Sequence, residues 1–252
     1  RSRGGFRLEA CSKGWQIGRF TVLNELGVPH LITTRRGPDI MQVRCDTGAA
    51  GLEIARVLGL EGSAFLEQVH GGDVLLCDRG GQIGRADGLV TTTRSLALVG
   101  KSADCPIVLI ADRDRRAAGF AHASWRATVA GIVPVVVQAM VDVGCAAGNL
   151  VACICPSAGP ECYEVSDEVR IAAMQGLGTH AAAFFRPGPN GRDHFDLWAA
   201  NADALHRAGL SVESIHIAGM CTLCRNDLFP SYRKEGDSAG RFAAAIGLGD
   251  ET

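Results

Sequence analysis

Short apolar runs dominate the first half of the chain, and several of them alternate between apolar and polar positions. Alternation with a period of two, or a short apolar run between turn residues, is typical of β-strands. We therefore expect strands at residues 17–25, 29–33, 65–70, 74–77, 88–92, 96–99, 106–111 and 117–122.

Helical periodicity appears between and after these strands. Apolar residues recur at helical spacing from Leu52 to Leu58, and Gly59 follows, which predicts a helix with a glycine at its end. Gly80 and Gly81 predict a turn. Helices are expected at residues 47–58, 128–143, 167–175 and 196–208, further strands at 150–155 and 214–219, and a surface loop at 176–192.

The order of these elements predicts the fold class. Strands cluster in the middle of the chain with helices around them, which favours an α+β fold of layered mixed β-sheets flanked by helices over a regular βαβ winding. We find no internal repeat, low-complexity linker or composition boundary. A single domain spanning residues 1–252 is therefore expected, with residues 1–15 peripheral or disordered.

Charge and hydropathy exclude some classes of partner. The 252 residues include 25 basic and 27 acidic side chains, and the formal net charge is −2. There is no basic tail and no apolar run of membrane-spanning length, so neither nucleic acid nor a membrane is an expected partner. The chain starts without Met and shows no signal-peptide core, so we expect a trimmed end and a cytoplasmic protein. The oligomeric state is not encoded in any pattern that we can identify.

Ten cysteines are present, and their setting argues against a disulfide framework. The chain is long and carries no secretion signal, and Cys153 and Cys155 lie in an apolar strand-like run. We expect most of these cysteines to be reduced thiols in the core.

Three polar residues at the ends of predicted strands carry the main chemical signal. His70 ends one strand and is followed by two glycines, Cys105 precedes the strand at 106–111, and His122 ends the strand at 117–122. Each could be an ordinary hydrogen-bonded or core residue when taken alone. Their shared position at strand ends suggests one site.

A predicted hairpin relates two of these residues. Residues 106–111 and 117–122 flank a charged turn, which is typical of an antiparallel pair. If residue 111 pairs with residue 116, Cys105 lies opposite His122, with Cβ atoms about 5 Å apart. A slip of one residue would put the two side chains on opposite faces.

Two imidazoles and a thiolate suit zinc, and three protein ligands leave the fourth position open, as in catalytic sites. We therefore expect one zinc ion held by His70, Cys105 and His122. A single copper ion is the alternative, since copper also binds this donor set. Gln68 and Asp104, two and one residues before ligands, are expected to orient an imidazole or a bound water.

Other motifs are weaker. Cys221 and Cys224 form a CxxC, but no second CxxC or HxxxH completes a structural zinc site. Tyr163 either stacks on a ligand or packs in the core. The forked donors of some arginines suit phosphate, and the candidates are Arg126, Arg233 and Arg241.

Several short segments, taken together, resemble the YfiH family of laccase-domain or polyphenol oxidase-like proteins, also described as purine nucleoside phosphorylases. The segments are QVHG at 68–71, ADGLVT at 86–91, ADCP at 103–106, HASWR at 122–126, GPECYEV at 159–165, DL at 196–197, CT at 221–222, FPSYR at 229–233 and AGR at 239–241. The resemblance covers roughly residues 31–246, and the combination is specific although no single motif is.

The resemblance implies a YfiH-like α/β/β/α domain over residues 1–252, with the metal ligands on His70, Cys105 and His122. The implied activity is phosphorolysis of adenosine, inosine and methylthioadenosine, with adenosine deamination as a second activity. The implied partners are purine nucleosides and phosphate. We expect Arg126, close to ligand His122, to contact phosphate beside a helix N-terminus, and Arg35, from the family's TTR segment, to be a second catalytic candidate.

The chain departs from the family pattern at two places. Ser124 and Ala127 replace glycines of the family's HAGWRG motif, which changes backbone freedom after the ligand. Residues 35–44 lack the asparagine that the family carries after TTR, which puts the substrate range in question.

Competing functions remain open. A multicopper laccase is disfavoured because the seven histidines are scattered and form no His-x-His pair. A conventional zinc nucleobase deaminase is disfavoured because its H-x-E and P-C-x-x-C signature is absent. The remaining alternatives are a single-copper polyphenol oxidoreductase, a metal-free hydrolase with a Cys105 nucleophile beside His122, and a non-catalytic regulator that binds a metal or a nucleoside.

Overall fold

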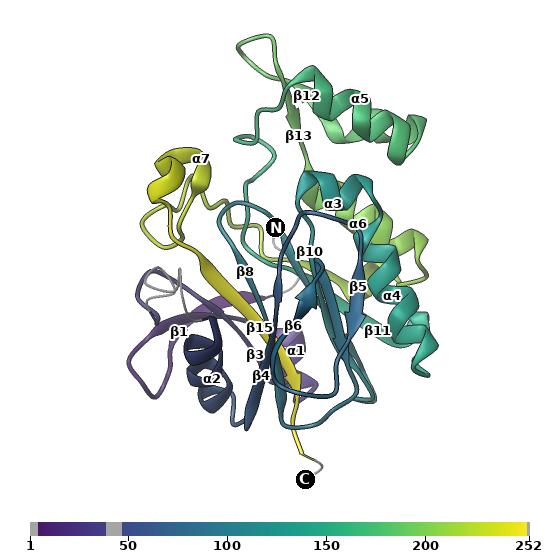
Figure 1. The fold of residues 1–252 in the computed structure, drawn as a ribbon. Coiled ribbons are helices and arrows are strands. Elements are labelled where there is room, and N and C mark those ends of the chain that lie inside the picture. Colours follow the sequence, from purple (N-terminus) through teal and green to yellow (C-terminus); the bar gives the residue numbers. More distant parts are fainter. Residues whose placement is uncertain (1–4, 39–46, 251–252) are drawn as a thin grey trace.

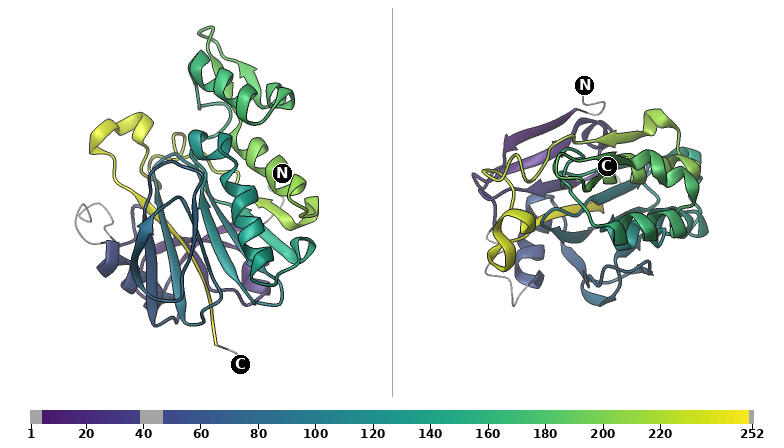
Figure 2. Two further views of the ribbon diagram at one scale, coloured as in Figure 1. Left: turned by 45° about the vertical axis from the view of Figure 1, so that its right-hand side comes forward. Right: turned by 90° about the horizontal axis from the view of Figure 1, so that it is seen from above.

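Two β-sheets pack face to face, and helices cover the outer face of each sheet (Figure 1). The structure, a computed structural model, describes residues 5–38 and 47–250. Figure 2 shows the same layers from two further directions. The predicted α+β fold of layered sheets flanked by helices is confirmed.

The larger sheet has seven strands and is mixed. Its order is β1 (Phe6–Ala10), β2 (Gln16–Phe20), β3 (His30–Thr33), β15 (Phe242–Leu248), β8 (Leu96–Ser102), β4 (Gly62–Glu67) and β6 (Gly81–Arg85). The C-terminal strand β15 therefore lies in the centre of the sheet, antiparallel to both β3 and β8. Strand β1, within the segment expected to be peripheral, pairs at the sheet edge.

The smaller sheet has six strands. Its order is β14 (Ile215–Ile217), β11 (Leu150–Ile154), β9 (Ile107–Asp112), β10 (Ala118–His122), β7 (Gly88–Thr91) and β5 (Val74–Leu76). A separate two-stranded sheet pairs β12 (Phe185–Pro187) with β13 (Asp193–Phe195). Figures 1 and 2 show this hairpin projecting beyond one end of the main sheets together with α5 (Asp167–Gly176).

Apolar side chains fill each interface between layers. The inner faces of the two sheets meet in a core that includes Phe20, Leu98, Phe120 and Ile246, each fully buried. Helix α2 (Thr47–Val57) covers the outer face of the seven-stranded sheet. Helices α4 (Ile132–Asp142) and α6 (Leu197–Arg207) cover the six-stranded sheet. The remaining helical elements are α1 (Thr21–Glu25), α3 (Trp125–Val129), α7 (Tyr232–Glu235) and the 3-10 turns Ala147–Asn149, Thr179–Phe184, Val212–Ser214 and Gly236–Ser238.

None of the helices within residues 5–38 and 47–250 combines the length and the apolar character that a membrane span requires.

The hairpin around the charged turn forms as an antiparallel pair, but the predicted register is wrong by two residues. His122 pairs with Ile107, and not with Cys105. The reason is Asp112, which was assigned to the turn but continues β9 as a buried strand residue. Its carboxylate accepts hydrogen bonds from the Arg116 backbone and from Asn149, which satisfy a charge that the sequence pattern assigned to solvent. Because the register differs by an even number of residues, each side chain still points to the predicted face of the sheet.

One predicted helix and one predicted strand also needed correction. The single helix expected at 128–143 is two helices, α3 and α4, separated at Gly131, which has a φ of 79°. The strand expected at 17–25 ends at Phe20, and the next residues form the short helix α1, which buries Leu23.

Other elements were missed or assigned wrongly. The segment expected as a surface loop at 176–192 contains the 3-10 turn Thr179–Phe184 and strand β12. Strands β1, β6 and β15 were not expected. Strand β15 is rich in alanine, has only one β-branched residue and shows no alternation, because both of its faces are buried.

The break between α3 and α4 yields a first prediction. Replacing Gly131 with alanine should destabilise the protein by about 1–2 kcal/mol, because a Cβ is disfavoured at this left-handed φ even though no atom lies within 4 Å of it. Gly148→Ala is the matched control, since Gly148 has equally open space and no positive φ. Urea unfolding of both variants measures the difference, and equal stabilities would contradict the account.

Candidate metal centre

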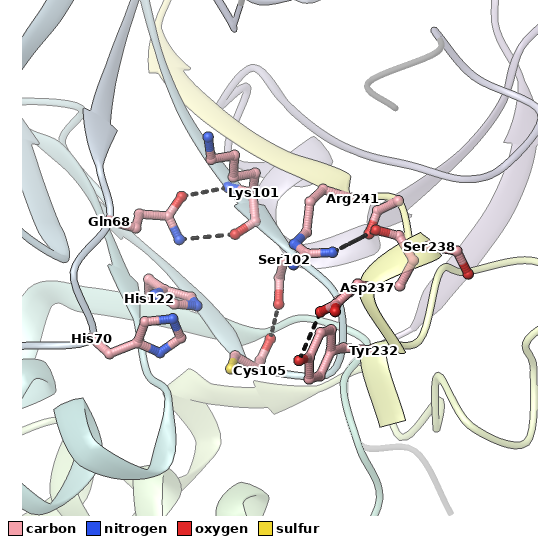
Figure 3. Close-up of a pocket in the computed structure, with 13 residues that line it drawn as sticks. Gln68, His70, Lys101, Ser102, Cys105, His122, Tyr232, Asp237, Ser238 and Arg241 are labelled. Carbon is pink, nitrogen blue, oxygen red and sulfur yellow. Dashed lines mark hydrogen bonds between the residues drawn. The ribbon is translucent and has the colours of Figure 1, made fainter. Parts of the chain in front are cut away.

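His70, Cys105 and His122 converge at one end of the two sheets (Figure 3). His70 lies in the loop after β4, Cys105 in the turn between β8 and β9, and His122 is the last residue of β10. The ligand atoms of the three side chains all lie within 4.8 Å of one another. The two imidazole rings have centroids 5.0 Å apart and planes at 70°.

The donor set fits a tetrahedral transition metal. Zinc takes nitrogen at about 2.0–2.1 Å and sulfur at about 2.3 Å, so donors within 4.8 Å of one another need only small side-chain rotations to share one ion. His122 is buried, Cys105 is half-buried and His70 is exposed. A metal ion held by these three side chains would therefore be sheltered on one side and open to a cavity on the other.

The thiol of Cys105 loses its proton readily, as a metal ligand must. Burial raises the pKa of this thiol, but hydrogen bonds and charge interactions with His122 and His70 outweigh burial and lower the pKa to about 7. A thiol must lose its proton to bind a metal ion. Because the thiol of Cys105 lies beside two imidazoles, it ionises more readily at neutral pH than an ordinary cysteine does.

Asp87 organises both histidines. Its carboxylate is fully buried, and Oδ1 lies 2.7 Å from Nδ1 of His122. Oδ2 accepts hydrogen bonds from the backbone N–H groups of Val69 and Gly71, the two neighbours of His70. One side chain therefore fixes the ring orientation of one ligand and the backbone of the other.

The ionisation of this group follows from its contacts. Burial lowers the pKa of His122, but the hydrogen bond that His122 donates to Asp87 and the contact with Cys105 outweigh burial and raise the pKa to about 9. Burial raises the pKa of Asp87, and its hydrogen bonds with His122, Gly71 and Val69 more than offset this, so its pKa is lowered. Asp87 is therefore an anion that leaves Nε2 of His122 free to face Cys105 and His70.

A cavity of about 960 Å³ opens beside the three ligands. Its wall combines the ligand cluster with the end of β8 and with the segment between α7 and β15. In Figure 3, Tyr232, Asp237 and Arg241 lie across from the two imidazoles. The lining residues are Gln68, His70, Lys101, Ser102, Ala103, Cys105, His122, Tyr232, Asp237, Ser238, Ala239, Gly240 and Arg241.

Gln68 lines this cavity, as a residue next to a ligand would. Its amide exchanges two hydrogen bonds with the backbone of Lys101, donating to the carbonyl at 2.8 Å and accepting from the N–H at 2.9 Å. These bonds join the loop that carries His70 to the strand that leads to Cys105.

Asp104 is buried and has an unusual φ of 87°. Its carboxylate accepts hydrogen bonds from Oγ1 of Thr222 at 2.6 Å, Oγ of Ser231 at 3.0 Å and the backbone of Arg233 at 2.7 Å. Asp104 thus holds the C-terminal part of the chain against the turn that presents Cys105, and does not itself line the cavity.

The structure places Arg35 and Arg126 away from the cavity lining. Arg35 forms an ion pair with Glu235 and donates to the carbonyl of Asn226. The guanidinium of Arg126 lies over the ring of Trp125, 4.2 Å from its centroid. Ser124, which replaces a family glycine, caps α3 by accepting a hydrogen bond from the backbone of Ala127.

Among the other candidates, Arg241 lines the cavity, where its guanidinium also donates to the carbonyls of Ala239 and Gly240. Arg233 lies over the ring of Tyr163, at 5.1 Å. The asparagine-free segment at 35–44 extends beyond residue 38 into a part of the chain outside the described residues.

The sequence reasoning missed Asp87, Lys101, Tyr232 and Asp237. Asp87 lies within the ADGLVT segment, and an acidic residue directly before an apolar strand-like run was a signal that it has a buried partner. The other three come together only through the pairing of β15 with β8, which no local pattern predicted.

A layered α+β domain with a His-Cys-His cluster beside an open cavity defines a class of metal-binding proteins. The family model described as multi-copper polyphenol oxidoreductase laccase matches residues 49–249. This chain therefore belongs to that laccase-like family, the YfiH family.

Relatives of this chain carry the name of one enzyme. The chain is 33% identical over 237 residues to a purine nucleoside phosphorylase of Deinococcus radiodurans, covering 88% of this chain and 90% of the relative. It is 35% identical over 188 residues to the purine nucleoside phosphorylase YfiH of Escherichia coli, covering 73% of each. Relatives named in this way suggest that this chain is an enzyme of the same kind.

Solved structures agree with the fold. The crystal structure of YlmD from Geobacillus stearothermophilus superposes with a TM-score of 0.86 at 27% identity, covering 96% of this chain and 99% of that one. The Bacillus licheniformis protein YfiH gives a TM-score of 0.85 at 26% identity, with 96% and 98% coverage.

The role of Asp87 yields a second prediction. Asp87→Asn should lower metal affinity about ten- to a hundred-fold, because the variant loses the charge that orients His122 and favours the bound state. Competition with a chromogenic chelator measures the affinity. Asp73→Asn is the matched control, since Asp73 is an exposed acid in the same loop as His70. Equal affinities for Asp87→Asn and the wild type would show that the carboxylate does not support the ligands.

Proposed function

We propose that this protein cleaves purine ribonucleosides at the glycosidic bond with phosphate, and that it does so with a zinc ion held by His70, Cys105 and His122. The observation that carries the proposal is the cavity, which presents the ligand cluster together with two cationic side chains, Lys101 and Arg241. The names of the relatives support the same reaction.

The proposed reaction has simple demands. A phosphate oxygen forms a bond to C1′ of the ribose while the bond from C1′ to the purine nitrogen breaks, and that electron pair leaves with the base. Positive charge develops on the sugar, and negative charge moves from phosphate to the departing purine. Catalysis then needs fixed cations for the phosphate and groups that stabilise the leaving base.

The cavity offers a residue for each demand. Arg241 and Lys101 are the cations that line it, and we assign them to phosphate in place of Arg35 and Arg126. We assign Asp237, which accepts a hydrogen bond from the hydroxyl of Tyr232 at 3.2 Å, to the ribose hydroxyls. The ring of Tyr232 provides a flat surface for the base or the sugar. A bound metal ion would supply a Lewis acid that polarises the purine.

The finer proposals follow the same site. Adenosine, inosine and methylthioadenosine are the proposed substrates, and deamination of adenosine is a proposed second activity in the same cavity. Residues 1–252 are proposed to act as one domain. Zinc is preferred to copper because both imidazoles and the thiolate suit it and because phosphorolysis involves no electron transfer.

One observation favours a second candidate, a metal-free hydrolase. A cysteine with a pKa of about 7 in contact with a buried histidine is the arrangement of an activated nucleophile. A nucleophilic cysteine would work without phosphate and without metal, whereas the phosphorylase needs phosphate.

The third prediction tests the reaction. The zinc-loaded protein, given adenosine, inosine or methylthioadenosine with phosphate, should release the free base and the corresponding 1-phosphate sugar, detected by chromatography. Omitting phosphate should abolish base release, and chelation should reduce it. Cys105→Ser should lack the activity under either hypothesis, so phosphate dependence is the decisive comparison. No base from any of the three nucleosides would reject the proposal, and base release without phosphate would favour the hydrolase.

The fourth prediction tests the assignment of Arg241. Arg241→Ala should raise the KM for phosphate about ten- to a hundred-fold, the loss expected for one hydrogen bond to a charged group. Arg241→Lys should recover part of this loss because it keeps the charge. Arg56→Ala, on an exposed position of α2, is the control and should leave the KM unchanged. A larger effect on the nucleoside KM than on the phosphate KM would move Arg241 to the nucleoside subsite.

A further inference from the structure

A second group of thiols lies outside the cavity. Cys162 is in the loop that precedes α5, and Cys221 and Cys224 are in the turn that follows β14. The three sulfurs lie within 4.8 Å of one another, and those of Cys162 and Cys224 are 3.4 Å apart. The fold therefore supplies, from 59 residues earlier in the chain, the partner that the lone CxxC lacks in sequence.

The sulfur of Cys221 is surrounded by backbone donors. The N–H of Gly159 lies 3.2 Å from it, and the N–H groups of Leu223 and Cys224 also donate to it. Donors from two and three residues further on wrap a CxxC turn around its first sulfur.

The loop that carries Cys162 is fitted closely to this turn. A Cβ at Gly159 would lie 3.0 Å from the Cβ of Cys221 and 3.3 Å from its sulfur, so the close approach favours glycine at this position. Ser157 and Cys221 also form a β-bridge, and the backbone N–H of Thr222 donates to the carbonyl of Ser157. The two segments that supply the sulfurs are thus held in register by backbone contacts.

We propose that Cys162, Cys221 and Cys224 form a second metal site, which binds a thiophilic ion such as zinc. A tetrahedral ion with bonds of about 2.3 Å to sulfur keeps its sulfur ligands about 3.8 Å apart. Here one pair of sulfurs is 3.4 Å apart, and all three lie within 4.8 Å of one another. A divalent cation that displaces the thiol protons would bind all three sulfurs at once. Cys224 is exposed, so an ion can reach the three sulfurs from solvent.

A disulfide is the competing chemistry for these thiols. It would join Cys162 and Cys224, whose sulfurs would have to approach from 3.4 Å to about 2.05 Å. It would leave Cys221, the sulfur with the most backbone donors, without a partner. The geometry of three sulfurs around a common point favours the metal ion.

The second site has a structural consequence for the first. Thr222, between the two cysteines of the turn, donates a hydrogen bond to Asp104, the neighbour of the ligand Cys105. An ion that closes the thiol cluster fixes this turn, and the turn fixes the segment that presents Cys105. The second ion is therefore proposed to be structural and to support the first site through Asp104.

The fifth prediction is the zinc content of the purified chain, kept reduced and supplied with zinc. Plasma mass spectrometry should find about two ions per chain in the wild type and about one in Cys162→Ser and in Cys224→Ser, since each removes a thiolate ligand. Cys11→Ser, which changes a half-buried cysteine outside both clusters, should keep the wild-type content. Cadmium should give a thiolate charge-transfer absorbance that falls in the two cluster variants and not in the control.

Cys105→Ser separates the two sites. It should lose the ion of the first site and keep the ion of the second, so a failure of the metal proposed for catalysis is distinguishable from a failure of this one. Thermal melting of Cys224→Ser, an exposed position, verifies that the variant is folded. Unchanged zinc content in both cluster variants would overturn the proposal. So would a Cys162–Cys224 disulfide, found by mass spectrometry in protein whose zinc content does not depend on these residues.

Discussion

The buried carboxylate of Asp87 is the interaction on which the candidate centre depends. It reaches His122 through Oδ1 and the two backbone neighbours of His70 through Oδ2. A carboxylate without exposure is costly unless each oxygen has partners, and here both oxygens do. The backbone N–H of His122 also donates to the carbonyl of Asp87. Removing Asp87 would therefore disturb two ligands from different segments of the chain at once.

The same logic explains two strained residues. His70 and Asp104 both have positive φ, at 61° and 87°, although neither is glycine. Such conformations cost about 1–3 kcal/mol each and persist where surrounding contacts determine them. For His70 those contacts are the hydrogen bonds to Asp87 on either side of it, and for Asp104 they are its own bonds to Thr222, Ser231 and Arg233. The strained backbone of His70 orients that ligand directly. The strained backbone of Asp104 orients the next residue, the ligand Cys105.

Sequence reasoning succeeded where the chemistry was local. The strand end at His122 and the antiparallel hairpin that precedes it are readable from patterns of a few residues. His70 was expected to end a strand, but β4 ends at Glu67 and His70 lies in the loop that follows. The register of the hairpin between β9 and β10 was predicted wrongly, because a buried, hydrogen-bonded Asp112 looks like a solvent-exposed turn residue in the sequence. Strand β15 was not predicted, because a strand buried on both faces shows no alternation of apolar and polar residues. Without β15, the approach of Arg241 to the ligand cluster was beyond prediction.

The C-terminal segment explains why the cavity could not be read from any one motif. Tyr232 begins α7, Asp237 and Arg241 lie between α7 and β15, and β15 pairs with β8, whose end carries Lys101. Asp104 binds Ser231 and Arg233 on the same segment and Thr222 beside the thiol cluster. One buried acid thus joins the wall of the cavity, the turn of Cys105 and the second group of sulfurs. Because these three parts come from distant stretches of the chain, chemistry at any of them depends on the whole fold being closed by its last strand.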